Sequence, residues 1–318
     1  MTRFAYDFER PLVELEERLD ELRAKHSADQ PDISAEIAYL ESEIEKIRLR
    51  VYSDLGPWER VQLSRHPDRP KASDYISQIF TGLVELHGDR LFGDDPAVMA
   101  ALGMLGAVKV AVLGTRKGKT TKENLKRNFG MAHPEGFRKA RRIMRLAGRF
   151  GLPIVFFVDT QGAYPGIGAE ERGQAWAISE NLVELGELPV PVIVVNVGEA
   201  GSGGALAMGF GDALLMLENA YYSVITPEGC ASILWRDASK APIAADALCL
   251  TADRLFELGI VDEVIPEVLG GANRDPAKTI FSVREALIRH LGLLCQRSGN
   301  ELVASRYQRL RKLGEFLE

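Results

Sequence analysis

The chain has 318 residues, of which 46% are hydrophobic and 26% are charged, and its net charge is −6. These values exclude a disordered or fibrous chain, and the length predicts one large α/β domain plus an accessory segment. Its three cysteines form no CxxC pair, which excludes a zinc knuckle and argues against a disulfide framework. Because the sequence has neither a signal core nor a stretch of 18 apolar residues, we expect a soluble, cytoplasmic protein with no membrane contact.

Residues 4–54 contain two heptad seams, which predict two helices packed as an antiparallel hairpin. His26–Pro31 interrupts the apolar pattern, whose members are Leu12, Leu15, Leu19, Leu22, Ile33, Ile37, Leu40, Ile44, Ile47 and Val51. Gly56-Pro57 and the polar run from Ser64 to Pro70 then indicate a boundary. We therefore expect a helical hairpin over 1–55, used for packing or subunit contact, a linker over 56–70 and the main domain over 71–318.

From residue 71 onward, segments with helical and strand character alternate, which predicts a layered α/β fold. Expected helices span 72–87, 134–150, 170–185, 203–209, 252–258, 276–297 and 301–316. Expected strands span 98–102 and 105–113, paired around Gly103, followed by 154–158, 192–197, 214–217 and 222–225. The runs 154–158 and 192–197 are apolar except for Asn196, which is typical of strands buried on both faces.

Positive charge is concentrated in one part of this acidic chain. Residues 109–149 hold 13 Lys and Arg against only Glu123 and Glu135, a net charge of +11, so the remainder carries −17. Such a stretch indicates a local anion site, and the alternative is a solvated helix face paired with acids elsewhere. A phosphate loop is excluded, because only three residues separate Gly114 from the Gly118-Lys119 pair where that motif requires four.

Two glycine-rich segments follow the two apolar strands. After 192–197 comes Glu199-Ala-Gly-Ser-Gly203-Gly204, in which glycines at a strand-to-helix turn free backbone N–H groups for an anion or an oxyanion. The alternative is tight packing of the helix on the strand. Ser202 does not form a hydrolase elbow, because Ala200 occupies the position where GxSxG requires glycine, and no histidine is placed to act as its base.

The second glycine-rich segment, Asp159–Gln174, follows the strand 154–158, and a helix begins near Glu170. Ligands bind at the carboxyl ends of parallel strands. We therefore expect the two loops, about 40 residues apart on successive strands, to converge on one carbonyl group.

Over nearly its whole length the sequence resembles the carboxyltransferase α subunits of bacterial acetyl-CoA carboxylases. The matching motifs are LFGDDPA (91–97), KRNFGMAHPEGFRKA (126–140), DTQGAYPGIGAEERGQ (159–174), GEAGSGGALAMG (198–209), YSVITPEGCASILW (222–235) and IPEVLGGANRDP (265–276). Two positions depart from the family pattern, Gln161 where proline is usual and Ala200 where glycine is common. Gln161 leaves the backbone of its loop less constrained than proline would.

The resemblance implies a crotonase-like fold, a spiral of ββα units, with the N-terminal helical hairpin and C-terminal helices added. It implies transfer of a carboxyl group from carboxybiotin, held on a separate carrier protein, to acetyl-CoA, which gives malonyl-CoA in the committed step of fatty acid biosynthesis. It also implies a β subunit with a zinc ribbon in an α2β2 assembly, and a biotin carboxylase that alone uses ATP. No metal is expected in this chain, and nucleic acid is not an expected partner.

In that chemistry the substrate and the cofactor supply the base, so the protein needs oxyanion donors and positioning. We expect the N–H groups of Gly203 and Gly204 to bind the urea oxygen of biotin, with support from Gly162, Ala163 and Gly166, while the β subunit holds the thioester enolate. For binding of CoA phosphates, or for the subunit interface, the expected residues are Arg116, Lys117, Lys119, Lys122, Arg127, Arg138 and Tyr164.

Two alternatives come from other classes. A hydratase or isomerase of the same fold would use Glu170, Glu171 or Glu199 as acid and base. A non-catalytic RNA-binding or scaffold subunit would use the +11 segment, although Phe129 and Phe137 are the only aromatic residues there that could stack on bases.

Overall fold

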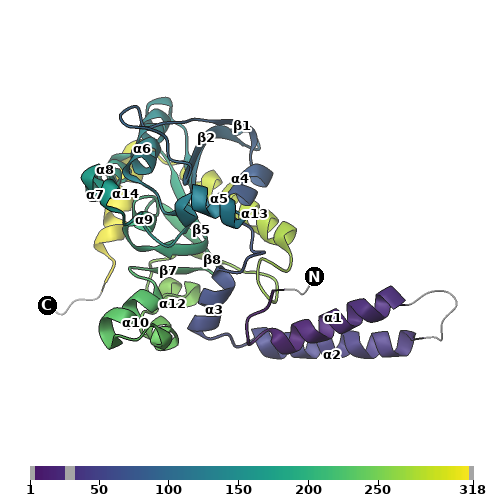
Figure 1. The fold of residues 1–318 in the computed structure, drawn as a ribbon. Helices are drawn as coiled ribbons and strands as arrows, with labels where there is room; N and C mark the ends of the chain where they lie inside the picture. The colour runs from purple at the N-terminus through teal and green to yellow at the C-terminus, as the bar shows by residue number, and fades with distance from the viewer. Residues whose placement is uncertain (1–3, 26–32, 315–318) are drawn as a thin grey trace.

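An eight-stranded mixed sheet forms the centre of the molecule in the computed structural model, which describes residues 4–25 and 33–314 (Figure 1). Seven strands lie in the order β1-β2-β3-β4-β5-β6-β8, and β7 pairs with β5. The first three are antiparallel, and β3 to β8 pair in parallel. Their bounds are β1 Thr81–Glu85, β2 Val98–Leu105, β3 Val108–Thr115, β4 Ile154–Thr160, β5 Val192–Gly201, β6 Ala213–Leu217, β7 Tyr221–Ser223 and β8 Glu263–Ile265.

Helices cover both faces of this sheet. On one face α6 (Pro134–Phe150) packs on β2 and β3, and α8 (Gln174–Glu187) and α14 (Gly299–Arg311) extend the layer. On the other face lie α4 (Ala72–Ile79) and α13 (Pro276–Leu294). Every residue of β4 and β5 is buried as a result, as their apolar sequences predict. The expected α/β class is confirmed, and no helix in the described residues is long and apolar enough to cross a membrane.

The N-terminal hairpin consists of α1 (Arg10–Lys25) and α2 (Ser34–Tyr52), which project from the body as a pair (Figure 1). Its core contains the predicted seam, with Leu12, Leu19, Leu40 and Ile44 buried. The expected interruption at His26–Pro31 lies outside the described residues. At the base of the hairpin, Arg274 donates to Glu16 and to the Tyr52 hydroxyl, which joins α1 and α2 to the body.

Several expected boundaries were wrong. The helix expected over 72–87 ends at Ile79, and the chain continues as β1, because backbone pairing with β2 outweighs the helical pattern. The β2–β3 turn lies at Gly106 (φ +59°) and not at Gly103, which sits within β2 opposite Val110. The helix expected over 170–185 is two helices, α7 (Ile167–Glu171) and α8, separated by Gly173 in the left-handed region (φ +81°).

The segment 56–70, expected as a linker, contains the helix α3 (Pro57–Ser64), whose Leu63 is buried against the hairpin core. The expected helix over 203–209 is the short α9 (Ser202–Leu206), and the helix expected over 301–316 is α14, which begins at Gly299 and already ends at Arg311. Further elements that the pattern did not predict are α5 (Thr121–Lys126), η1 (Asn128–Gly130), α10 (Pro227–Trp235), η2 (Ala238–Lys240), α11 (Ala241–Ala247) and β8. The expected helix 252–258 is present as α12 (Ala252–Glu257).

Arg306 ties the C-terminal helix α14 to the sheet. Its guanidinium is fully buried, forms a two-pronged ion pair with Asp212 at 2.7 and 3.0 Å, and donates to the carbonyl oxygens of Leu185, Leu188 and Val190. The carboxylate and the three carbonyl groups obtain these bonds from one side chain. Removal of that side chain would leave them buried without their donor, which is costly.

We expect Arg306→Met to lower the free energy of unfolding by about 3–5 kcal/mol, the usual cost of breaking a buried ion pair. Urea unfolding followed by circular dichroism measures the change. Arg311→Met is the matched control, since Arg311 is exposed in the last turn of the same helix and should change stability by less than about 0.5 kcal/mol. Equal urea midpoints for Arg306→Met and the wild type would contradict this role.

Candidate functional site

The candidate site lies at the carboxyl ends of the adjacent parallel strands β4 and β5. Phe157 pairs with Val195, and near the strand ends Thr160 pairs with Ala200, so the segments that follow the two strands emerge side by side. After β4 the chain enters the glycine-rich loop 161–166, and after β5 it turns directly into α9. The edge formed by such strand ends is where open α/β sheets bind ligands.

The two glycine-rich segments touch through their backbones. A Cβ atom on Gly204 would lie 2.2 Å from the carbonyl carbon of Gly162 and 2.4 Å from the nitrogen of Ala163, and one on Gly201 would lie 2.1 Å from the carbonyl oxygen of Gln161. No larger residue fits at either position without moving a backbone. The alternative reason for these glycines, tight packing, therefore holds for Gly204. A side chain at that position would displace the loop after β4 as well as the first turn of α9.

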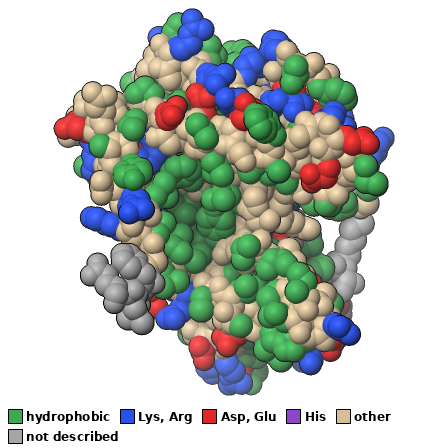
Figure 2. All heavy atoms as spheres, turned by 90° about the vertical axis from the view of Figure 1, so that its left-hand side faces the viewer, with side chains coloured by type: hydrophobic (Ala, Val, Ile, Leu, Met, Phe, Trp, Pro, Cys, Tyr) green, Lys and Arg blue, Asp and Glu red, His purple; other side chains and the backbone are tan. Residues whose placement is uncertain are grey.

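The position of Gly203 is less crowded than that of Gly204. A Cβ on it would meet only the Ile178 side chain at 3.5 Å, which is an ordinary contact. Gly203 and Ser202 border a cavity of about 770 Å³, here called the Gly203 groove, with Leu206, Tyr222, Ser223, Val224, Leu248, Leu255, Glu257, Leu258, Ile260 and Lys312 to Gly314. Figure 2 looks onto this side of the molecule, where hydrophobic side chains gather in a hollow. The first turn of α9 thus opens on a mainly apolar groove.

Hydrogen bonds fix the loop after β4. The Thr160 hydroxyl donates to the carbonyl oxygen of Gly130 at 2.7 Å and accepts from the N–H of Gly162 at 3.2 Å. Tyr164 donates its N–H to the carbonyl of Ala132, and its ring lies 4.2 Å from that of His133. A Cβ on Gly166 would collide with the Tyr164 ring at 2.3 Å. Gly162, Ala163 and Gly166 therefore belong to one braced loop, and Tyr164 packs within it.

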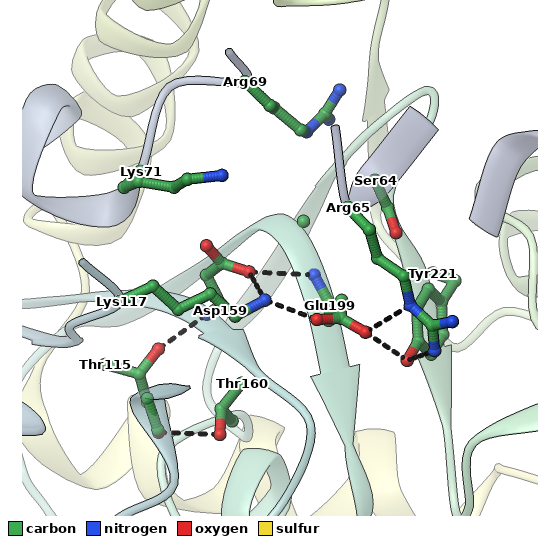
Figure 3. Close-up of polar contacts among 12 residues, drawn as sticks. Ser64, Arg65, Arg69, Lys71, Thr115, Lys117, Asp159, Thr160, Glu199 and Tyr221 are labelled. Carbon is green, nitrogen blue, oxygen red and sulfur yellow. Dashed lines mark hydrogen bonds and ion pairs between the residues drawn. The ribbon is translucent and has the colours of Figure 1, made fainter. Parts of the chain in front are cut away.

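A buried carboxylate, Glu199, lies at the end of β5 beside this loop (Figure 3). It accepts from Arg65 Nε at 2.7 Å, from Lys117 Nζ at 2.5 Å and from the Tyr221 hydroxyl at 2.9 Å. Lys117 also pairs with Asp159 at 2.7 Å, and Asp159 accepts from the backbone N–H of Glu199. The network joins five separate segments of the chain at the strand ends.

The electrostatics of this network exclude one proposed chemistry. Burial alone would raise the pKa of Glu199, but the charges of Lys117 and Arg65 outweigh burial and lower that pKa to about 2. A general acid needs a raised pKa, so Glu199 does not serve the hydratase alternative. Glu170 and Glu171 are exposed on α7 and do not border the Gly203 groove.

The basic residues singled out in the sequence do not gather around one ligand. Five of the six are held by carboxylates or by backbone carbonyl groups: Arg116 by Glu85, Lys117 by Asp159 and Glu199, Lys119 by Asp74, Arg127 by the Lys117 carbonyl, and Arg138 by Asp89. Lys122 is exposed, and no carboxylate of the described chain lies within 4 Å of it. Lys117 and Lys119 share a cavity of about 290 Å³, whereas Arg138 borders a separate one.

The sequence missed two members of the Glu199 network. Arg65 and Tyr221 lie 134 and 22 residues away from Glu199 along the chain, and only tertiary structure joins them. The sequence did contain one indication that such partners exist. Glu199 follows a strand that is apolar except for Asn196, and a carboxylate in that position needs a cation. Phe137, considered for base stacking, is buried in the core and cannot stack on RNA. In the described residues no cluster of His, Cys, Asp or Glu could hold a metal ion.

Comparisons with known proteins show which family the chain belongs to. The acetyl-coenzyme A carboxylase carboxyl transferase subunit alpha of Thermus thermophilus is 51% identical over 312 residues, which cover 98% of this chain and 99% of that protein. The protein of the same name from Syntrophotalea carbinolica is 54% identical over 312 residues, 98% of each chain.

Among solved structures, transcarboxylase 12S with methylmalonyl-coenzyme A and methylmalonic acid bound superposes with a TM-score of 0.60 at 19% identity, over 74% of this chain and 43% of that one. A Pseudomonas malonate decarboxylase hetero-tetramer in complex with coenzyme A gives 0.56 at 17% identity, over 70% of this chain and 91% of that one. These likenesses define the fold as that of the crotonase-like carboxyltransferases. The chain belongs to the acetyl co-enzyme A carboxylase carboxyltransferase-like family, whose model matches residues 5–314.

We expect Glu199→Gln to destabilise the protein by about 3 kcal/mol at neutral pH, because the lowered pKa of Glu199 is a stabilising contribution. That contribution is complete above the ordinary pKa of 4.5 and is lost as the pH falls through about 2. The difference between wild type and variant should therefore narrow in acid. Urea unfolding at a series of pH values measures it, with Glu170→Gln on the surface as control. A gap that stays constant into acid would contradict the role given to this carboxylate.

Proposed function

We propose that this chain is the α subunit of an acetyl-CoA carboxylase carboxyltransferase, which transfers a carboxyl group from carboxybiotin to acetyl-CoA to form malonyl-CoA for fatty acid biosynthesis. Full-length relatives at about half identity support the assignment. The observation that carries the chemistry is the first turn of α9, which opens at Gly203 onto the mainly apolar groove. Backbone donors at such a position stabilise negative charge on a planar oxygen without a catalytic side chain.

The groove fits the bicyclic ring of biotin in size and in chemistry. Its volume of about 770 Å³ is within the usual range of small-molecule sites, and its walls include Leu206, Val224, Leu255 and Leu258. When bound, carboxybiotin supplies the carboxyl group and, after losing it, a basic ureido oxygen. We propose that the N–H groups of Gly203 and Gly204 donate to that oxygen.

The neighbouring residues hold this donor pair in place. Gly162 and Ala163 lie against Gly204 and fix the position of the N-terminus of α9. Gly166 leaves room for the Tyr164 ring, which braces the loop. The Glu199 network anchors the end of β5 three residues before α9 begins. A donor that is already oriented needs no reorganisation as charge develops, which is the main source of oxyanion stabilisation.

The partners proposed for this chain follow from the number of charges that the reaction develops. One negative charge forms on the urea oxygen of biotin and one on the thioester oxygen, and the N–H groups of the glycine turn stabilise only the first. We propose that a β subunit bearing a zinc ribbon holds the thioester enolate, in an α2β2 enzyme, with a biotin carboxyl carrier protein and an ATP-using biotin carboxylase as further partners in the cytoplasm. Of the basic residues, we propose Lys122 for acyl-CoA phosphates or the subunit interface, because the others have partners within the chain.

We expect Gly203→Val to lower kcat by a factor of about 100 to 1000 in the assembled α–β enzyme, because its branched side chain would stand where the urea oxygen approaches the helix terminus. The melting temperature should change little, since a Cβ on Gly203 meets only the Ile178 side chain, at an ordinary contact distance. The measurement is kcat per mole of assembled complex, together with the melting temperature. Gly186→Val in α8 is the matched control, because a Cβ there meets nothing within 4 Å. Near wild-type turnover in an assembled Gly203→Val enzyme would remove this turn from the active site.

We expect the α chain alone to be inactive, because it offers donors for only one of the two developing oxyanions. Decarboxylation of malonyl-CoA in the presence of biotin should stay at background with the purified chain and rise on addition of the β subunit. Robust turnover by the α chain alone would contradict the two-subunit proposal.

A further inference from the structure

One face of α6 carries a row of arginines that the proposed function does not use. They lie at positions i, i+3, i+4, i+7 and i+11 of the helix, which places them on one side: Arg138, Arg141, Arg142, Arg145 and Arg149. With Arg90 and Arg172 they border a cavity of about 710 Å³, here called the arginine cavity. Seven arginines and two carboxylates, Asp89 and Glu180, line it, so its lining is strongly positive.

Four of these arginines have carboxylate partners. Arg138 pairs with Asp89, Arg141 and Arg145 pair with Glu184, and Arg172 pairs with Glu135. Such pairs hold guanidinium groups in fixed positions but leave little charge for a ligand.

The other three, Arg90, Arg142 and Arg149, have no carboxylate within 4 Å in the part of the chain that the structure describes. Arg142 donates to the carbonyl oxygens of Gly88 and His87 at 3.0 and 3.1 Å, and Arg90 donates to that of His87 at 3.0 Å. Burial, and then repulsion from Arg90, lower the pKa of Arg142. Asp94 and Asp89 offset only part of this effect, and positive charges held close together are unfavourable until an anion binds.

The loop before β2 holds Arg90 in this place. Asp89 accepts the backbone N–H groups of Leu91, Phe92 and Gly93 at 2.8–2.9 Å, and its other oxygen binds Arg138. Arg90 itself adopts a left-handed backbone (φ +65°), a conformation that is costly for a residue with a side chain. The backbone of Arg90 is thus held in a costly conformation, and this keeps its guanidinium beside that of Arg142, where neither has a carboxylate partner among the described residues. Such an arrangement indicates an anion site.

An aromatic ring completes the cavity. Trp176 of α8 borders it and is 70% exposed, and an indole offers a flat surface on which a base stacks. Guanidinium forks match phosphate oxygens, and adjacent phosphates concentrate more charge in a small volume than the separate carboxylates of a peptide do. We propose that the arginine cavity binds a nucleoside carrying two or more phosphate groups, with the phosphates on Arg90, Arg142 and Arg149 and the base on Trp176.

The site is separate from the Gly203 groove. Gly203 faces Ile178 on one side of α8, and Trp176 lies in the arginine cavity. Two kinds of molecule carry such a group: a free nucleotide, and an acyl-CoA with its phosphorylated nucleoside end. Because Arg142 and Arg149 do not border the groove, failure of this proposal would leave the carboxyl-transfer tests of Gly203→Val unaffected.

The test is calorimetric titration of the full α chain, alone and assembled with its β subunit, at low and high salt. The probes are ATP, 3′,5′-adenosine bisphosphate, acetyl-CoA and inorganic tripolyphosphate. We expect nucleotide binding that weakens with salt and that falls by roughly tenfold or more in the double variant Arg142→Gln, Arg149→Gln. Trp176→Leu should weaken ATP by roughly fivefold or more and leave tripolyphosphate unchanged. Arg311→Gln, which removes an exposed charge of α14 outside the cavity, should change neither.

The relative affinities of the probes identify the source. Tighter binding of ATP would indicate a free nucleotide, and tighter binding of the bisphosphate and acetyl-CoA would indicate an acyl-CoA. The proposal fails if the assembled enzyme binds none of the nucleotides, if the double variant binds them as the wild type does, or if tripolyphosphate binds as tightly as ATP. It also fails if a single-stranded RNA or an oligo-glutamate peptide binds the arginines more tightly than every nucleotide.

Discussion

Burial of the Glu199 carboxylate at the end of β5 is the constraint around which this site is organised. An ionised carboxylate in that position requires cations and hydrogen-bond donors, and the chain supplies Arg65 from the segment after α3, Lys117 from the loop after β3 and Tyr221 from β7. Each of these segments is thereby pinned to the same sheet edge. The end of β4 joins them through Asp159, which shares Lys117 with Glu199.

On this rigid edge, the candidate chemistry depends on backbone rather than on side chains. Gly204 approaches Gly162 so closely that helix and loop are in backbone contact, while its neighbour Gly203 is open to the groove. Adjacent glycines thus differ in why they lack a side chain: the reason is steric at Gly204, and in the function proposed above it is access of an oxygen to the helix terminus at Gly203. A site of this kind tolerates many changes in the side chains of the groove walls, but few changes in the two turns.

Much of the central fold could be predicted from local patterns. The runs 154–158 and 192–197 are apolar at every position except Asn196, and α6 begins at Pro134 and ends before Gly151, so these elements lie where the sequence predicts. The strand β1 was missed because pairing with β2 overrides its helical pattern. The glycine turns were found because the need for glycine is local, whereas the pairing of Arg65 with Glu199 spans 134 residues and leaves no local signal.

The buried Arg306 has a consequence for how the protein is made. Asp212 and the carbonyl groups of Leu185, Leu188 and Val190 receive donors from a residue that is synthesised about 100 residues later. While the chain is still on the ribosome, the region around β5 carries buried polar groups that nothing yet satisfies, and this opposes early closure of the sheet. Completion of the core therefore waits for release of the last helix, and until then the nascent protein depends on protection from aggregation.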